Sequence, residues 1–222
     1  MNTNYTAVSR PSLSALEANK VLKNTYLLLS ATLAFSAVMA VVSMAINVPP
    51  MAYIISLIAS MVLGIFVLPK AANSSAGIGV IFLITGLLGF GLGSILSIYM
   101  AMSNGPQVVA TALGGTGIIF LGLSGYALTS KKDFSFLGGF LFAGMMVVLL
   151  AIIASLFIQM PALSLTISAA VIMLMSGFIL FDTSRIINGG ETNYIMATYG
   201  IFLSIFNIFI SLLNILGIMG DD

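Results

Sequence analysis

The sequence lacks histidine, cysteine and tryptophan. Without histidine it has no side chain whose ordinary pKa lies near neutral pH, and without cysteine it has no thiol nucleophile. The usual nitrogen and sulfur ligands of zinc are also missing. These absences argue against most enzyme classes, so we expect a non-enzymatic protein with no cofactor and no bound metal. The formal net charge of +1 is too small to attract nucleic acid.

Charged residues are also scarce, at 6% of the 222 residues, whereas hydrophobic residues make up 60%. A soluble chain carries about 25% charged residues, so this chain cannot cover a water-facing surface. A transmembrane helix needs about 20 apolar residues to cross the hydrocarbon layer. Seven stretches are close to this length: 24–46, 51–68, 77–100, 108–129, 136–158, 163–181 and 194–218. The sequence therefore predicts an all-α integral membrane protein with seven transmembrane helices.

The seven basic residues all fall on one side of the predicted membrane: Arg10, Lys20, Lys23, Lys70, Lys131, Lys132 and Arg185. Cytoplasmic loops of membrane proteins collect lysine and arginine. We therefore expect a cytoplasmic N-terminus and an extracytoplasmic C-terminus. The predicted organisation is a cytoplasmic tail over residues 1–23, a transmembrane domain over 24–218 and a short extracytoplasmic tail over 219–222.

Small residues four positions apart occur three times within the predicted spans. The pairs are Gly89 with Gly93, Ala110 with Gly114, and Gly139 with Ala143. This spacing lets two helix backbones approach closely in lipid, where dispersion contacts drive helix association. Tight helix packing is predicted at each pair.

One face of the last predicted span is polar. It carries four residues at steps of three, four and three: Ser204, Asn207, Ser211 and Asn214. At 100° per residue these side chains fall within an arc of roughly 80°. Lipid cannot satisfy hydroxyls and amides, so we expect this face to point into the helix bundle. Two interpretations remain open, hydrogen bonds between helices or the wall of a path for water or ions.

Asp182 ends the long apolar run of the sixth predicted span. A carboxylate at the centre of a transmembrane helix costs about 2.5 to 3.5 kcal/mol, so such residues usually have a function or a partner. Asp182 lies about 28 Å along the helix from Leu163, close to the cytoplasmic boundary. Arg185 follows on the same helix face and could form an ion pair with it. The alternative is that Asp182 and Arg185 act as an ion- or proton-sensing pair.

Four segments of the chain resemble the Bax inhibitor-1 family. They are residues 20–26 (KVLKNTY), 131–139 (KKDFSFLGG), 181–186 (FDTSRI) and 189–195 (GGETNYI). The last segment is similar to the bacterial YccA branch of this family. The resemblance covers nearly the whole chain, and its motifs include loop residues.

The resemblance implies a bundle in the bacterial inner membrane, in which six helices surround a central seventh. It also implies that the protein binds and modulates FtsH, a membrane-bound ATP-dependent protease, and is degraded by FtsH from its N-terminal tail. The alternative that it implies is a pH-sensitive leak for calcium or protons, closed by two aspartates. Asp182 matches the first aspartate, but Ser204 stands at the second position and adds no charge for calcium.

Overall fold

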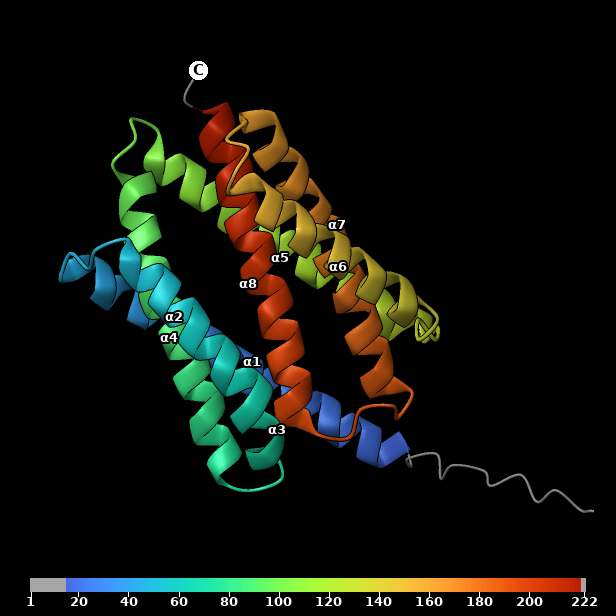
Figure 1. The fold of residues 1–222 in the computed structure, drawn as a ribbon. Coiled ribbons are helices and arrows are strands. Elements are labelled where there is room, and N and C mark those ends of the chain that lie inside the picture. The colour runs from blue at the N-terminus through green and yellow to red at the C-terminus, as the bar shows by residue number, and fades with distance from the viewer. Residues whose placement is uncertain (1–14, 221–222) are drawn as a thin grey trace, which may run out of the picture.

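The computed structural model describes residues 15–220 as helices joined by short loops (Figure 1). The helices are α1 (Ala15–Ala45), α2 (Met51–Val62), the π-helix η1 (Leu63–Val67), α3 (Leu68–Ala71), α4 (Ala76–Met100), α5 (Gly105–Ser130), α6 (Leu137–Ser155), α7 (Pro161–Ile187) and α8 (Tyr194–Met219). Because α2, η1 and α3 follow one another without a break, they form one span. By length and composition, seven helices in the described part of the chain can cross a membrane.

All seven predicted spans are present, and their boundaries differ most in α1 and α7. Helix α1 begins at Ala15 instead of residue 24, so the described part of the predicted N-terminal tail is helical. Residues 1–14 and 221–222, which make up the rest of the two predicted tails, lie outside the described residues. Helix α7 continues to Ile187 instead of ending at residue 181. Asp182 and Arg185 therefore both lie on the last turns of a helix.

The wide turn η1 precedes Pro69, which lies in the first turn of α3. A proline inside a helix donates no backbone hydrogen bond, and its ring clashes with the carbonyl four residues before it. A π-turn opens the helix at such a position and relieves this conflict. In the same turn, the missing side chain of Gly64 leaves space that the ring of Tyr199 from α8 fills.

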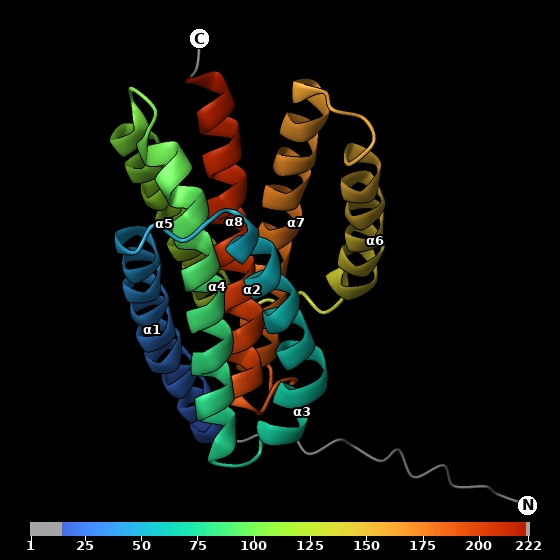
Figure 2. The same ribbon diagram turned by 60° about the vertical axis from the view of Figure 1, so that its left-hand side comes forward.

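The core of the bundle lies around α4 and α8, the two most buried spans. Helix α8 packs against α7, α5, α1 and α4, while α4 also packs against α1 and α2. Helix α6 packs against α7 and lies at the edge of the bundle (Figure 2). The structure thus shows α8 packed mainly on four helices, while Tyr199 of α8 also reaches Gly64 of the second span. The enclosure of α8 by all six other helices stays a prediction.

The first of the three predicted small-residue pairs is confirmed as a close approach of two backbones. A Cβ atom at Gly89 or Gly93 of α4 would overlap the carbonyl oxygen of Ser36 or Ala40 in α1. Glycine is therefore required at both positions for α1 and α4 to pack as they do.

The other two predicted pairs are wrong as packing sites within the described chain. A Cβ atom at Gly114 or Gly139 would meet no atom within 4 Å. Their partners Ala110 and Ala143 are exposed. The spacing was correct for close packing, but these faces of α5 and α6 turn away from the other helices.

Candidate functional site at the α7–α8 interface

The polar face of α8 meets α7 through Asn214. The Nδ2 atom of Asn214 donates hydrogen bonds to the Oγ atoms of Ser164 and Ser168, both at 2.8 Å. The two serines lie one turn apart on α7, so a single amide can reach both of them. At this position the predicted polar face links two helices.

Two of the other polar residues of α8 bond to their own helix. Ser204 is buried, and its hydroxyl donates to the carbonyl oxygen of Gly200 at 3.1 Å. The Asn207 amide donates to the carbonyl oxygen of Leu203 at 2.8 Å. Ser211 is buried on the same face. These bonds satisfy polar side chains inside an apolar bundle without a partner from another helix.

Asp182 lies against α8 at the end of the bundle that carries the basic loops. A Cβ atom at Gly200 would lie 2.8 Å from its Oδ2 atom, so the absence of a side chain at Gly200 lets the carboxylate approach α8. Asp182 is partly buried. Ser204 lies one turn farther along α8 from Gly200 and bonds back to it. The structure therefore brings Asp182 and Ser204 to neighbouring turns of the same interface.

Arg185 forms its ion pair with Glu191 rather than with Asp182. The Nη2 atom of Arg185 lies 3.4 Å from Oε2 of Glu191 and donates to the carbonyl oxygen of Gly190 at 3.2 Å. The guanidinium also lies 5.4 Å from the centre of the Phe181 ring. Gly189, with a φ of 75°, reverses the chain after α7 and brings Glu191 back to Arg185. Arg185 is therefore part of the loop structure, while Asp182 points toward α8.

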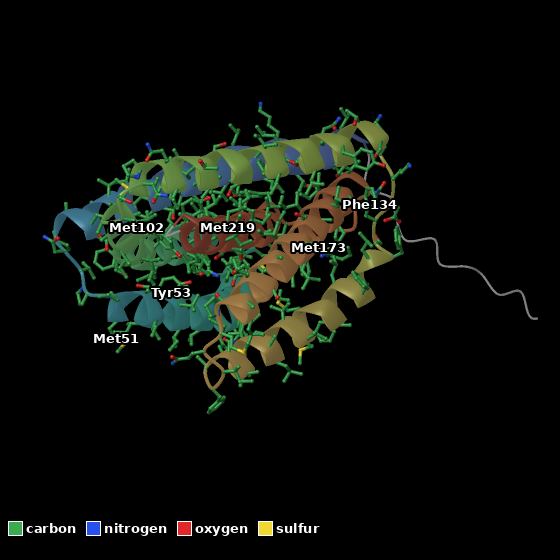
Figure 3. The ribbon with its side chains drawn as sticks, turned by 90° about the horizontal axis from the view of Figure 1, so that it is seen from above. Met51, Tyr53, Met102, Phe134, Met173 and Met219 are labelled. Atoms are coloured by element: carbon green, nitrogen blue, oxygen red, sulfur yellow. The ribbon has the colours of Figure 1, made fainter. Side chains whose placement is uncertain are left out.

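Sequence reasoning missed Ser184, a buried residue of α7 that holds the loop between α5 and α6. Its Oγ donates to the carbonyl oxygen of Lys132 at 3.1 Å and accepts from the amide of Phe134 at 2.9 Å. Figure 3 places Phe134 at the end of the bundle opposite to Met51 and Met102. In the same loop, hydrogen bonds from the Ser135 side chain and amide lower the pKa of Asp133, which is therefore ionised at neutral pH.

Asn193 was also missed, although it joins two loops at this end of the bundle. Its Oδ1 atom caps α8 by accepting from the amides of Ile195 and Met196, at 2.9 and 3.1 Å. Its Nδ2 atom donates to the carbonyl oxygen of Ala72 at 3.0 Å and to Oδ1 of Asn73 at 2.8 Å. Asparagine is a favoured N-cap residue, and its position directly before the last span is a signal that could have identified it.

Hydrogen bonds of hydroxyl groups connect α1 to other helices of the bundle. The Tyr26 hydroxyl is hydrogen-bonded to the Ser124 hydroxyl of α5, which lies 3.4 Å from the Thr183 hydroxyl of α7. The Thr198 hydroxyl of α8 donates to the carbonyl oxygen of Thr25 at 3.2 Å. These contacts join four helices near the level of Asp182. Within residues 15–220, no group of three His, Cys, Asp or Glu residues is placed to hold a metal ion.

The family profile described as "Inhibitor of apoptosis-promoting Bax1" matches residues 18–221. The chain belongs to the Bax inhibitor-1 family. The match covers all seven spans, including the α7–α8 interface with Asp182 and Asn214.

Several bacterial relatives are similar over almost their full length. A membrane protein of Vibrio cholerae is 53% identical over 207 residues, which cover 93% of each chain. The Escherichia coli K12 protein named "Modulator of FtsH protease YccA" is 50% identical over 209 residues, or 94% of each chain. A Pseudomonas aeruginosa protein is 47% identical over 207 residues, or 93% of this chain and 92% of its own.

The hydrogen bonds between Asn214 and α7 predict an energetic coupling between the two helices. We expect Asn214→Ala and Ser168→Ala each to lower the free energy of unfolding. In the double variant, the loss of free energy should be smaller than the sum of the two single losses. The coupling should be about 0.6 kcal/mol, and at most about 1.7 kcal/mol, as for other hydrogen bonds between transmembrane helices.

This coupling can be measured by unfolding the four proteins in detergent micelles. A matched control replaces Asn207 with alanine, because Asn207 bonds within α8 and should show no coupling to Ser168. Strictly additive losses for Asn214→Ala and Ser168→Ala would contradict the bond across the interface.

Proposed function

We propose that this protein binds and modulates FtsH in the bacterial inner membrane. The observation that carries the proposal is the 50% identity, over 94% of both chains, to the Escherichia coli modulator of FtsH protease. An identity of this extent spans the loops as well as the membrane helices. The Escherichia coli O6:H1 protein with the same identity is named an inner membrane protein. The proposed role needs no catalytic residue of its own.

The end of the bundle with the basic loops is suited to bind a cytoplasmic partner. Hydrogen bonds donated by the side chains of Ser184, Asn193 and Arg185 hold three loops in place there. Basic residues at this end support a cytoplasmic orientation. We therefore propose that this surface faces the cytoplasm. We also propose that six helices surround α8 and that residues 219–222 form a short extracytoplasmic tail.

We also propose that FtsH engages the N-terminal tail and degrades the protein from that end. Residues 1–14 precede α1, which begins at Ala15 and continues directly into the first span. A protease that pulls on this segment would act on α1. Helix α1 is held by the Tyr26–Ser124 and Thr198–Thr25 hydrogen bonds, so these contacts would resist extraction.

Deletion of residues 2–14 tests engagement through the tail. We expect the shortened protein to be degraded more slowly in cells that contain FtsH, because the protease loses the segment it grips. Its half-life can be measured after synthesis is stopped, with FtsH-deficient cells as the reference.

A matched control replaces residues 2–14 with an unrelated flexible sequence of equal length. Restored turnover in this control would show that length rather than sequence matters. Unchanged FtsH-dependent turnover after the deletion would contradict engagement through this tail. If crosslinking in native membranes captured no FtsH with the full-length protein, the proposed binding itself would be contradicted.

The second candidate function is a pH-sensitive leak for calcium or protons. The observation in its favour is the approach of the Asp182 carboxylate to Gly200, one turn from Ser204. A path along this interface would also use Asn207, Ser211 and Asn214. In the described structure, however, Asn214 bonds to α7, and Ser204 and Asn207 bond to backbone carbonyls. We rank this function second for that reason.

Flux measurements in reconstituted vesicles test the leak. If Asp182 senses protons, the flux of calcium or protons should depend on pH in the wild type, and this dependence should disappear in Asp182→Asn. Asp133→Asn is the matched control, because Asp133 lies in an exposed loop. Absence of flux at every pH, or identical curves for wild type and Asp182→Asn, would rule out this function.

A further inference from the structure

A cavity of about 440 Å³ lies between α1 and α5, on the side of α8 opposite to its polar face. At their ends near the basic loops, α1 and α5 are joined by the Tyr26–Ser124 hydrogen bond. The rings of Tyr26 and Phe120 lie 6.1 Å apart there. Beyond this bridge the two helices enclose the cavity, with α4 and α8 behind it. The cavity belongs to neither the α7–α8 interface nor the loops proposed to meet FtsH.

The deepest part of the cavity is aromatic. Phe202, Phe206 and Phe209 of α8 line it and are almost fully buried. The rings of Phe202 and Phe206 are stacked, with their centres 6.1 Å apart. We call these three residues the aromatic floor. They present an apolar surface to whatever occupies the cavity.

The hydroxyl groups in the cavity wall do not make it polar. Thr116 donates to the carbonyl oxygen of Ala112, one turn earlier in α5, at 2.7 Å. The Ser36 hydroxyl lies against Gly89 of α4. A water molecule in a buried site needs two to four polar partners, and apolar cavities stay dry. We therefore expect an apolar occupant rather than water.

The cavity opens sideways, between two transmembrane helices. Val41 of α1 and Leu113 of α5 line it and are 64% and 58% exposed. Both residues lie within membrane spans, so the medium at the opening is the hydrocarbon layer. They also lie toward the ends of α1 and α5 that are distant from the basic loops. Lipid from the membrane leaflet opposite to those loops therefore has direct access to the cavity.

The size of the cavity distinguishes an acyl chain from a partner helix. An apolar cavity of about 150 Å³ binds a benzene molecule, so this one has nearly three times that volume. An α-helix with its side chains is about 10–12 Å across, and 440 Å³ corresponds to roughly one of its turns. A transmembrane partner could cover the opening but would leave the floor without contacts. A flexible hydrocarbon chain can fill the cavity and restore the dispersion contacts that an empty space loses.

We propose that this cavity binds one acyl chain of a bilayer phospholipid, which enters between α1 and α5 and contacts the aromatic floor. The bound chain differs from ordinary lipid around the protein because it reaches residues that are shielded from the surrounding bilayer. It would also pack directly against α8, the helix that carries the polar face.

Photocrosslinking with a phospholipid that carries a diazirine near the end of one acyl chain tests the proposal. The full-length protein is reconstituted in vesicles of this lipid, irradiated and analysed by peptide mass spectrometry. We expect labelling within residues 202–209, because an inserted chain end meets the aromatic floor. Absence of label there, with label on exposed residues such as Ile118, would overturn the proposal.

Gly117→Phe should close the cavity. Gly117 lines it, and a Cβ atom at this position would meet no atom within 4 Å, so the new ring has room to enter. We expect labelling of the floor to fall about tenfold, which corresponds to about 1.4 kcal/mol. The matched control is Gly122→Phe on the same helix, where a Cβ atom also meets nothing and no cavity residue is replaced. Its labelling should equal that of the wild type.

Ala37→Phe, on the α1 wall, provides a second variant if Gly117→Phe does not fold, as judged by its thermal unfolding. Equal labelling of the floor in wild type and in a folded cavity-filling variant would overturn the proposal. If residues 202–209 were crosslinked to another protein in native membranes, the proposal would also be overturned. Turnover by FtsH is a separate measurement, so failure here leaves the proposed function untouched.

Discussion

The hydrocarbon layer offers no hydrogen-bond partners, so each polar side chain on a membrane helix must find its partner within the protein. This constraint applies most strongly to α8, which carries two serines and two asparagines along one face. Asn214 meets it by bonding to two serines of α7, while Ser204 and Asn207 bond to carbonyls of α8 itself. The polar face is therefore turned toward α7. The apolar face that remains lines the cavity between α1 and α5.

At the ends of the bundle, polar side chains can also interact with water and with charged groups. Arg185 and Glu191 form a partly exposed ion pair, which contributes about 0 to 1 kcal/mol. The hydrogen bonds of Ser184 and Asn193 shape the loops more specifically, since each residue bonds to backbone groups far away in the sequence. A loop surface fixed in this way can present a constant shape to a cytoplasmic protease. The membrane interior and the loop end thus carry separate proposed roles, one toward lipid and one toward FtsH.

Hydropathy was sufficient to locate all seven spans, because seven stretches have the length and composition that the bilayer requires. The period of Ser204, Asn207, Ser211 and Asn214 also indicated the inward face of α8. The sequence could not show which small residues pack, since Gly89 and Gly114 both belong to pairs of small residues four positions apart but face different surroundings.

Other features of the site depend on how distant segments meet. The backbone reversal at Gly189 brings Glu191 close to Arg185, so Arg185 forms its ion pair with Glu191 and not with Asp182. Ala72 and Asn73, which accept hydrogen bonds from the Nδ2 atom of Asn193, lie more than a hundred residues earlier. The cavity depends on the spacing of α1 and α5. Neither arrangement follows from local sequence pattern.

The orientation of the polar face of α8 can be tested most directly by cysteine accessibility, because the natural chain has no cysteine. Ser204→Cys and Ser211→Cys place a thiol on that face, and Ile118→Cys places one on an exposed surface of α5. A thiol reagent dissolved in the lipid phase should modify position 118 rapidly and positions 204 and 211 slowly. Equal rates at all three positions would show that the polar face of α8 meets lipid and would contradict this account.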